Sequence, residues 1–250
     1  MTILILTATI RVPPSAPGIV RADPLVRLRD YQNTLAFYIS FLGKGLDRII
    51  FAENSGSDLS ELQEIAMPVT GYVDFLSFQG NDFPPAYGRC FGEATIIDEV
   101  MQSQHVSNRP EATIYWKSTG RYQVKNFDRM TKTMPPGAQF YCDMRRRGAQ
   151  RWADMRLMSW TRKGYREFLA GIAPLLREDL RNYRPGEEAL FDVLEQRFSN
   201  STLQYARSFV TEPLIDGFRA FDNKNWSSGR QMLVYHARNL QRQILQRVVF

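Results

Sequence analysis

A cluster of cationic and hydroxyl side chains follows one apolar stretch of this 250-residue chain. The stretch reads ATIYW at positions 112–116, and Lys117, Thr119 and Arg121 come directly after it. Arginine forms paired hydrogen bonds with phosphate, and lysine presents a compact positive charge. A diphosphate that departs from a sugar gains negative charge, so fixed cations would stabilise that transition state. We therefore expect these three residues to bind a donor diphosphate; the alternative is a solvated strand end with a glycine turn.

A second candidate segment combines two glycines with an arginine and an acid. Gly88, Arg89, Gly92 and Glu93 stand at the predicted start of a helix. Glycine lets a ligand approach the backbone, and free N–H groups at a helix start attract anions. Glu93 is expected either to favour the helix dipole or to accept a sugar hydroxyl. An ordinary strand-to-helix loop is the alternative, and neither GxGxxG nor GxxxxGK[ST] occurs.

Two further polar groups follow predicted strands. Thr9 and Arg11 come after the first strand, and Glu53, Asn54 and Ser55 end the second. Open parallel sheets bind ligands beyond the carboxyl ends of their strands. We therefore add these five residues to the donor-binding set.

Sugar transfer with inversion also needs a general base near the acceptor hydroxyl. Asp143 follows the predicted strand QFYC and precedes three arginines, Asp154 lies between Arg151 and Arg156, and Glu187 begins a predicted helix. These three acids are the candidates for catalysis. A helical ion-pair set around Asp154 and a dipole-stabilised helix start at Glu187 are the alternatives.

Alternating strands and helices would position these groups. Strands are predicted at 2–10, 47–53, 72–78, 112–117 and 139–142, and helices at 25–42, 93–104, 187–198 and 231–248. Strand and helix in alternation predict a mostly parallel sheet with right-handed crossovers. We expect residues 1–150 to form an α/β core that binds the nucleotide-sugar. Residues 151–250 are expected to form a mainly helical, acceptor-side part of the same domain.

The composition of the chain indicates where in the cell the protein works. No stretch approaches the roughly 20 apolar residues of a membrane span, and residues 1–10 have the character of a buried first strand without a basic leader. Cys90 and Cys142 are far apart and have no metal or disulfide spacing. These features predict a cytoplasmic protein, and the lack of a spread basic face argues against nucleic acid as its partner.

The C-terminal tail carries most of the net charge of +6. No acid follows Asp222, whereas five cations do: Lys224, Arg230, Arg238, Arg242 and Arg247. An amphipathic helix with this charge is expected to lie on an anionic membrane surface, which would place the protein peripherally on the inner face of the plasma membrane. The alternative is a helix that closes the domain and exposes its arginines.

The chain resembles a group of bacterial polysaccharide and lipopolysaccharide glycosyltransferases. The resemblance rests on YGRCFGEATIIDEVM at 87–101, KSTGRYQVKN at 117–126 and RWADMR at 151–156, and covers roughly residues 2–165. In that group a G-K-G-x-G-E helix start precedes a K-x-T-G-R-Y strand. The resemblance implies a GT-A-like fold, a nucleotide-sugar donor (UDP by frequency) and a glycan or glycolipid acceptor such as O-antigen or capsule.

One departure from the GT-A pattern concerns the metal. Many such enzymes place Asp-x-Asp after the fourth strand to hold Mn²⁺ or Mg²⁺, but this chain has Lys117-Ser118-Thr119 there and no Asp-x-Asp elsewhere. We therefore expect Lys117 and Arg121 to replace the ion, with no metal or other cofactor. Two alternatives remain: a nucleotidyltransferase, which usually needs paired acids for two metals, and a non-catalytic protein that binds RNA or another anion.

Overall fold

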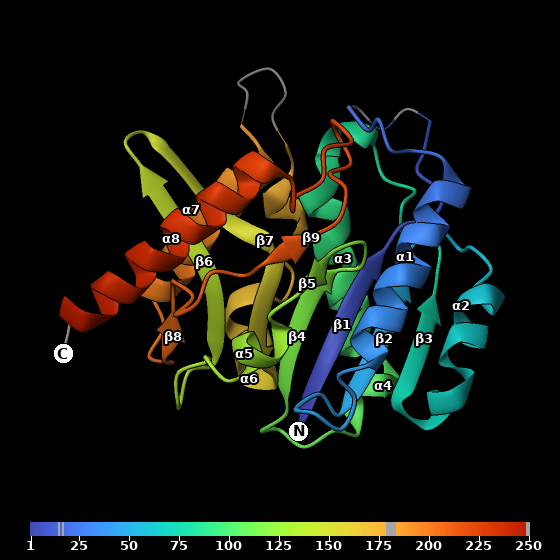
Figure 1. The fold of residues 1–250 in the computed structure, drawn as a ribbon, viewed down its shortest axis with the longest axis horizontal. Helices are drawn as coiled ribbons and strands as arrows, with labels where there is room; N and C mark the ends of the chain where they lie inside the picture. The colour runs from blue at the N-terminus through green and yellow to red at the C-terminus, as the bar shows by residue number, and fades with distance from the viewer. Residues whose placement is uncertain (15, 17, 179–183, 249–250) are drawn as a thin grey trace.

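A seven-stranded sheet forms the centre of the molecule (Figure 1). The computed structural model describes residues 1–14, 16, 18–178 and 184–248, without the side chains of 243 and 245–248. The strand order is β3-β2-β1-β4-β7-β6-β8. The strands are β1 (Thr2–Ala8), β2 (Arg48–Glu53), β3 (Val73–Ser77), β4 (Ile114–Thr119), β6 (Phe140–Arg147), β7 (Gln150–Thr161) and β8 (Tyr205–Ala206).

The pairing directions confirm the expected mostly parallel α/β sheet. β1 pairs in parallel with both β2 and β4, β2 with β3, and β6 with β8. Only β7 runs against its neighbours in this described sheet, because it pairs antiparallel with both β4 and β6. Two short strands, β5 (Gln123–Val124) and β9 (Ile215–Asp216), form a separate antiparallel pair.

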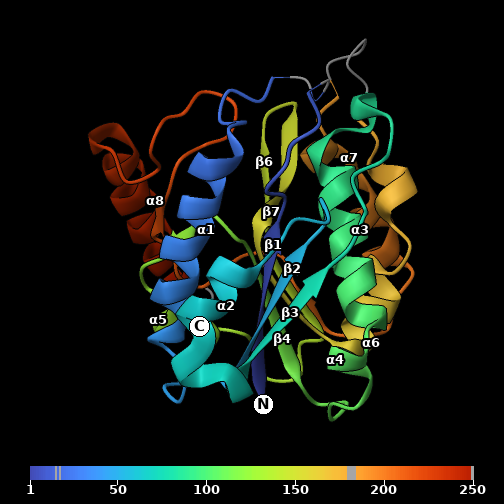
Figure 2. The same cartoon turned by 90° about the vertical axis from the view of Figure 1, so that its right-hand side faces the viewer.

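Helices cover both faces of the sheet, as the edge-on view in Figure 2 shows. One face carries α1 (Pro24–Ile39), α2 (Ser60–Ala66), α5 (Phe127–Thr131) and α8 (Gly229–Val248). The other carries α3 (Gly88–Gln102), α4 (Gln104–Ser107), α6 (Arg162–Gly164) and α7 (Gly186–Ser199). Short turns of other helix types lie between them: η1 (Met67–Tyr72), η2 (Pro85–Tyr87), η3 (Tyr165–Leu169) and η4 (Ala173–Leu176).

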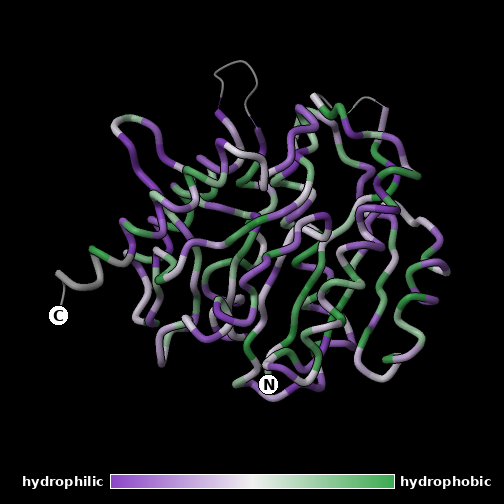
Figure 3. The backbone as a smooth tube through the Cα atoms, in the orientation of Figure 1, coloured by the Kyte–Doolittle hydropathy of each residue, from purple (hydrophilic) through white to green (hydrophobic). Residues whose placement is uncertain are grey.

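The core is divided by the sheet into two layers. Ile3 and Ile5 of β1 point into one apolar cluster, and Leu4 and Leu6 point into the other. This alternation follows from the two-residue period of a strand, and a central strand therefore needs apolar residues at every position. Figure 3 shows hydrophobic segments through the centre of the fold and hydrophilic residues at the tip of the β6–β7 hairpin.

Two predicted elements need correction. Residues 151–250 were expected to be mainly helical, but residues 150–161 form β7 in the interior of the sheet. Alanine, methionine, leucine and arginine in this segment favour helix on their own, and pairing with two neighbouring strands overrides that preference. In addition, α3 begins at Gly88, five residues before the predicted start at Glu93. The predicted helices at 187–198 and 231–248 are confirmed as α7 and α8.

Among the described residues, no helix is both long and apolar enough to cross a bilayer.

Candidate functional site

A cavity of about 500 Å³ opens beyond the carboxyl ends of β1 and β4, against the start of α3. Two loops that are far apart in sequence, one after β1 and one before α8, form one side of the cavity, which we call its roof. The Ala220 carbonyl accepts hydrogen bonds from the N–H groups of Val20 and Arg21, at 2.9 and 3.0 Å. The loop after β1 and the loop before α8 are thereby joined above the cavity.

Ten of the fifteen predicted site residues line this cavity: Thr9, Asn54, Gly88, Arg89, Gly92, Glu93, Thr119, Arg121, Asp154 and Glu187. They come from the loops after β1 and β2, the end of β4 and the turn after it, β7, and the starts of α3 and α7. Five others lie outside it: Arg11, Glu53, Ser55, Lys117 and Asp143. The carboxyl ends of neighbouring parallel strands meet at one sheet edge, which explains why residues so far apart in sequence converge.

Lys117 does not face the cavity, contrary to prediction. Its side chain is fully buried between β4 and α3, and its Nζ bonds the Glu93 carboxylate and the Met155 carbonyl. Burial lowers the pKa of Lys117, and the charge of Glu93 opposes that effect. An ammonium enclosed in this way holds Glu93 in place and cannot contact a bound diphosphate.

Glu93 is anchored through one carboxylate oxygen. Its Oε1 accepts hydrogen bonds from Thr7 Oγ1 and Thr119 Oγ1, both at 2.8 Å, in addition to the Lys117 contact. Oε2 has no hydrogen-bond partner in the described part of the chain, and Glu93 lines the cavity. One oxygen is thus fixed by the protein, while the other is free to accept a ligand hydroxyl.

Glu53 shapes the loops that border the cavity. Its carboxylate is completely buried and accepts hydrogen bonds from the N–H groups of Ile10, Ser55 and Ser57 at 2.8–3.0 Å. The Ser55 hydroxyl is bound to the same carboxylate. Glu53 and Ser55 were predicted to bind the donor, but they hold the loop backbone in place and do not line the cavity. Arg11 is exposed, and its N–H donates to Ser55 Oγ at 3.0 Å.

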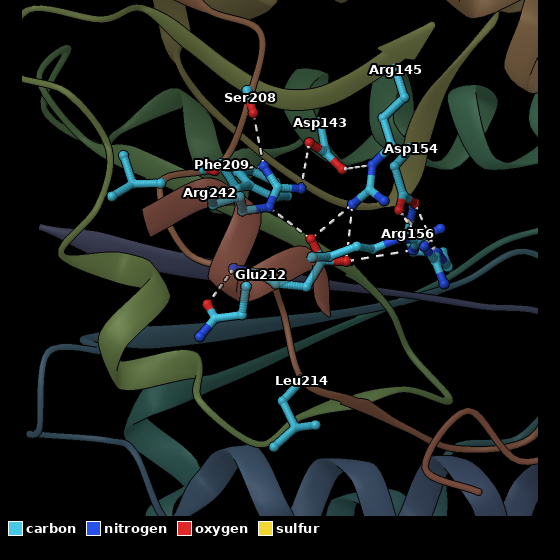
Figure 4. Close-up of polar contacts among 12 residues, drawn as sticks. Asp143, Arg145, Asp154, Arg156, Ser208, Phe209, Glu212, Leu214 and Arg242 are labelled. Carbon is cyan, nitrogen blue, oxygen red and sulfur yellow. Dashed lines mark hydrogen bonds and ion pairs between the residues drawn. The ribbon is translucent and has the colours of Figure 1, made fainter. Parts of the chain in front are cut away.

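Asp143, predicted as a general base, lies in a buried charge cluster away from the cavity (Figure 4). Its Oδ2 accepts from Arg145 Nε at 2.5 Å, and its Oδ1 accepts from Arg242 Nη2 at 2.8 Å. Both arginines also bind Glu212. One oxygen binds Arg145 of the same strand and the other binds Arg242 of α8, so Asp143 is not placed to take a proton from an acceptor.

Asp154 reaches the cavity from β7, but it is held by a neighbour two residues away. Arg156 donates to it through its backbone N–H and its guanidinium. Burial raises the pKa of Asp154, but the charge and hydrogen bonds of Arg156, together with the charge of Arg145, outweigh burial and hold the pKa below its ordinary value. The Arg156 guanidinium in turn lies 4.2 Å above the ring of Trp226, another cavity residue.

Two buried guanidiniums of the cavity wall have no carboxylate partner in the described chain: Arg27 of α1 and Arg121 after β4. Arg27 is 5% exposed and donates to the Thr9 carbonyl at 2.7 Å. Arg121 is 7% exposed and donates to the Phe218 carbonyl at 2.8 Å, and its buried Nε has no partner among the described residues. Burial lowers the pKa of Arg27, and the positive charge of Arg121 acts in the same direction.

Arg27 was not among the residues predicted from sequence. It lies within a predicted helix, where an arginine is usually a solvated surface residue. The only signal in the sequence is its position one turn before Tyr31, whose hydroxyl accepts from Arg27 Nη2 at 3.0 Å. Its burial depends on the loop after β1, which the sequence does not place.

The backbone conformation at position 88 favours glycine. It has a φ of +79°, and a Cβ there would lie 2.1 Å from the carboxyl carbon of Glu178. The positive φ is strained for any residue with a Cβ, and a larger residue would also displace the Glu178 side chain. Glu178 therefore packs directly on the start of α3, and burial raises the pKa of its carboxyl group.

One cluster in the described residues has a metal-ligand composition. The ligand atoms of Cys90, Glu178 and Glu187 lie within 4.8 Å of one another. Burial raises the pKa of the Cys90 thiol well above its ordinary value, and Arg89 lies 3.6 Å from Glu187. Mg²⁺ and Mn²⁺ favour oxygen ligands, so a neutral thiol beside a guanidinium fits poorly with such an ion.

No family model matches the chain, and no curated protein matches it. Among solved structures it is similar to a 4-diphosphocytidyl-2C-methyl-D-erythritol synthase, with 10% identity and a TM-score of 0.42 over 93% of this chain and 95% of that one. It is also similar to a protein from Desulfovibrio desulfuricans G20 described as a nucleotide-diphospho-sugar transferase, with 10% identity and a TM-score of 0.45 over 97% of each chain. A likeness at this level says nothing of ligand or activity.

Proposed function

We propose that this protein transfers a sugar from a nucleotide-sugar donor and that the donor diphosphate binds between Arg27 and Arg121. The observation that carries the proposal is the pair of buried guanidiniums without a carboxylate partner among the described residues. Two like charges in a water-poor site disfavour one another, and a bound anion relieves that cost. Arginine binds phosphate through two parallel hydrogen bonds, so a diphosphate suits this pair.

The remaining cavity wall suits the rest of a nucleotide-sugar. A cavity of about 500 Å³ lies in the usual range for small-molecule sites. Glu93 Oε2 and the side chains of Thr9 and Asn54 offer acceptors and donors to hydroxyl groups. Phe221 and Trp226 add aromatic surface on the roof side, where a base or sugar ring can stack.

Glu187 is our choice for the general base. A base needs a free lone pair that faces the acceptor. Asp154 is held by several bonds from Arg156, whereas the only ion pair of Glu187 in the described chain is with Arg89, at 3.6 Å. Glu187 also begins α7 at the cavity wall, so its side chain is positioned by a helix rather than by a free loop.

The acceptor follows from the resemblance to glycosyltransferases of bacterial polysaccharides. On that basis we propose a growing surface glycan or a lipid-linked sugar as the acceptor. Nucleotidyl transfer is the second candidate within the enzymes. The two differ in product, because glycosyl transfer releases a nucleoside diphosphate and nucleotidyl transfer releases pyrophosphate.

A ligand screen tests the proposal. Purified protein would be titrated with UDP, GDP, CMP and dTDP sugars, with thermal stabilisation as the readout and a short RNA as the control. Saturable stabilisation by one nucleotide-sugar, unchanged in EDTA, is the expected result. Stabilisation by RNA alone, with a steep salt dependence, would instead identify a nucleic-acid-binding protein. A strict need for a divalent ion would contradict the role given to the arginines.

A further inference from the structure

The C-terminal helix α8 exposes an apolar stripe. Leu233, Leu240 and Ile244 are 72%, 58% and 51% exposed, and Ala237 between them is exposed as well. With 3.6 residues per turn, these four positions fall on one side of the helix. A row of exposed leucine and isoleucine side chains indicates a surface that binds an apolar partner, either another protein or a membrane.

The opposite side of α8 is attached to the protein by charge. Arg242 donates to Asp143, Glu212 and the Phe209 carbonyl (Figure 4). Arg238 Nη1 lies 3.6 Å from Glu212 Oε1. The Arg242 side chain is only 10% exposed. These contacts orient the helix, so its apolar stripe has to face outward. The side chain of Arg247 lies outside the described residues.

The apolar stripe could be covered by a second copy of α8 or by a membrane, and the charges of α8 favour one of these two partners. The helix has four arginines and no acid, and the whole chain after Asp222 has none. Arg238 and Arg242 are paired with acids on the opposite side, so Arg230 is the exposed arginine beside the stripe among the described side chains. Two copies of α8 packed through the stripe would bury Arg230 of each copy with no acid on either helix to pair with it, which is unfavourable. A membrane rich in anionic lipids offers both an apolar interior and negative headgroups. Arg230, exposed and next to the stripe on the helix surface, is placed to meet those headgroups.

We propose that α8 binds the surface of an anionic membrane with Leu233, Leu240 and Ile244 in the acyl boundary and Arg230 at the headgroups. This corrects the expectation that Arg238 and Arg242 contact the membrane, since Glu212 and Asp143 hold them. The roof loop of the cavity leads directly into α8. Binding through α8 therefore brings the cavity close to the membrane surface.

Vesicle flotation tests the proposal with the full chain. Vesicles of equal parts phosphatidylcholine and phosphatidylglycerol should carry the protein upward, and vesicles of phosphatidylcholine alone should carry much less. Replacing the stripe with glutamine (Leu233→Gln, Leu240→Gln and Ile244→Gln together) should lower the bound fraction about tenfold, because it removes the apolar surface without adding charge. Arg230→Gln should lower binding only to the anionic vesicles.

A matched control uses exposed apolar residues elsewhere. Met67 and Leu175 are 67% and 55% exposed and lie outside α8, so Met67→Gln with Leu175→Gln should leave flotation unchanged. Thermal unfolding of all variants verifies that they remain folded. The proposal is overturned if the wild type fails to float, or if the control loses as much binding as the stripe variant. It is also overturned if light scattering shows a dimer that the stripe variant converts to monomer, since a second copy would then cover α8.

Discussion

The ammonium of Lys117 bonds the carboxylate of Glu93 across the contact between β4 and α3, and both side chains take part in one hydrogen-bonded group with Thr7 and Thr119. Lys117 is inside the protein, and Glu93 stands at the cavity wall. Lys117, which was predicted to bind ligand, therefore positions Glu93, another predicted site residue. Substitution of Lys117 should therefore affect stability, whereas substitution of Arg121 should affect turnover.

Lys117→Ala should destabilise the protein. It removes one partner of a buried ion pair and leaves Glu93 without its cation, which costs about 3 kcal/mol. The free energy of unfolding in urea is the measurement. Lys117→Ala combined with Glu93→Gln should regain part of the loss, because no unpaired carboxylate remains. A single variant as stable as the wild type would show that the pair contributes nothing to folding.

Arg121→Ala should reduce turnover while the fold is retained. Loss of one preorganised cation at a developing charge costs on the order of 10²–10³-fold in rate. Because Arg121 has no carboxylate partner in the described chain, its removal leaves no acid unpaired. We expect an unchanged or raised melting temperature without ligand, and a weaker response to a nucleotide-sugar.

The control for Arg121 is Arg11→Ala. Arg11 is exposed outside the cavity and bonds Ser55 through its backbone N–H, which alanine keeps. This variant should behave as the wild type in both assays. Equal losses in the two variants would point to a general effect of net charge, and the proposed diphosphate site would then be rejected.

Glu187→Gln and Asp143→Asn should separate catalysis from folding. If Glu187 is the base, its amide variant should lower kcat by about 10²–10⁴-fold with little change in donor binding. Asp143→Asn should instead lower stability, since it weakens the contacts of Arg145 and Arg242. Steady-state kinetics and thermal unfolding of both variants provide the measurement. A drop in kcat for Asp143→Asn at unchanged stability would reverse the assignment.

Low pH should remove the contribution of the Asp154 carboxylate to the stability of the fold. Burial raises the pKa of Asp154, but the charge and hydrogen bonds of Arg156, with the charge of Arg145, together hold the pKa below its ordinary value of 3.8. A carboxyl whose pKa is lowered in the folded state stabilises above the unfolded pKa, and that stabilisation is lost as pH falls through the folded pKa. Asp154→Asn should therefore be less stable than the wild type at neutral pH, and the gap should narrow below about pH 4. Unfolding free energies at several pH values test this, and a gap independent of pH would contradict it.

Much of the fold could be read from local patterns. Continuous apolar runs predicted β1, β2 and β4, because strands buried on both faces need apolar residues throughout. The helical periodicity at 25–42 predicted α1, which spans Pro24–Ile39. β7 escaped detection because its residues favour helix, and only its pairing with β4 and β6 makes it a strand.

The sequence by itself determined which segments end at the carboxyl edge of the parallel strands, so ten predicted residues gather around one cavity. Only the tertiary structure decided which charges remain free. Lys117 was paired with Glu93, and Asp143 with Arg242, over separations of 24 and 99 residues. Arg27 and Arg121 were brought together without a carboxylate among the described residues. Charge pairing depends on distances of a few ångströms between side chains from different elements, and no spacing along the chain encodes those distances.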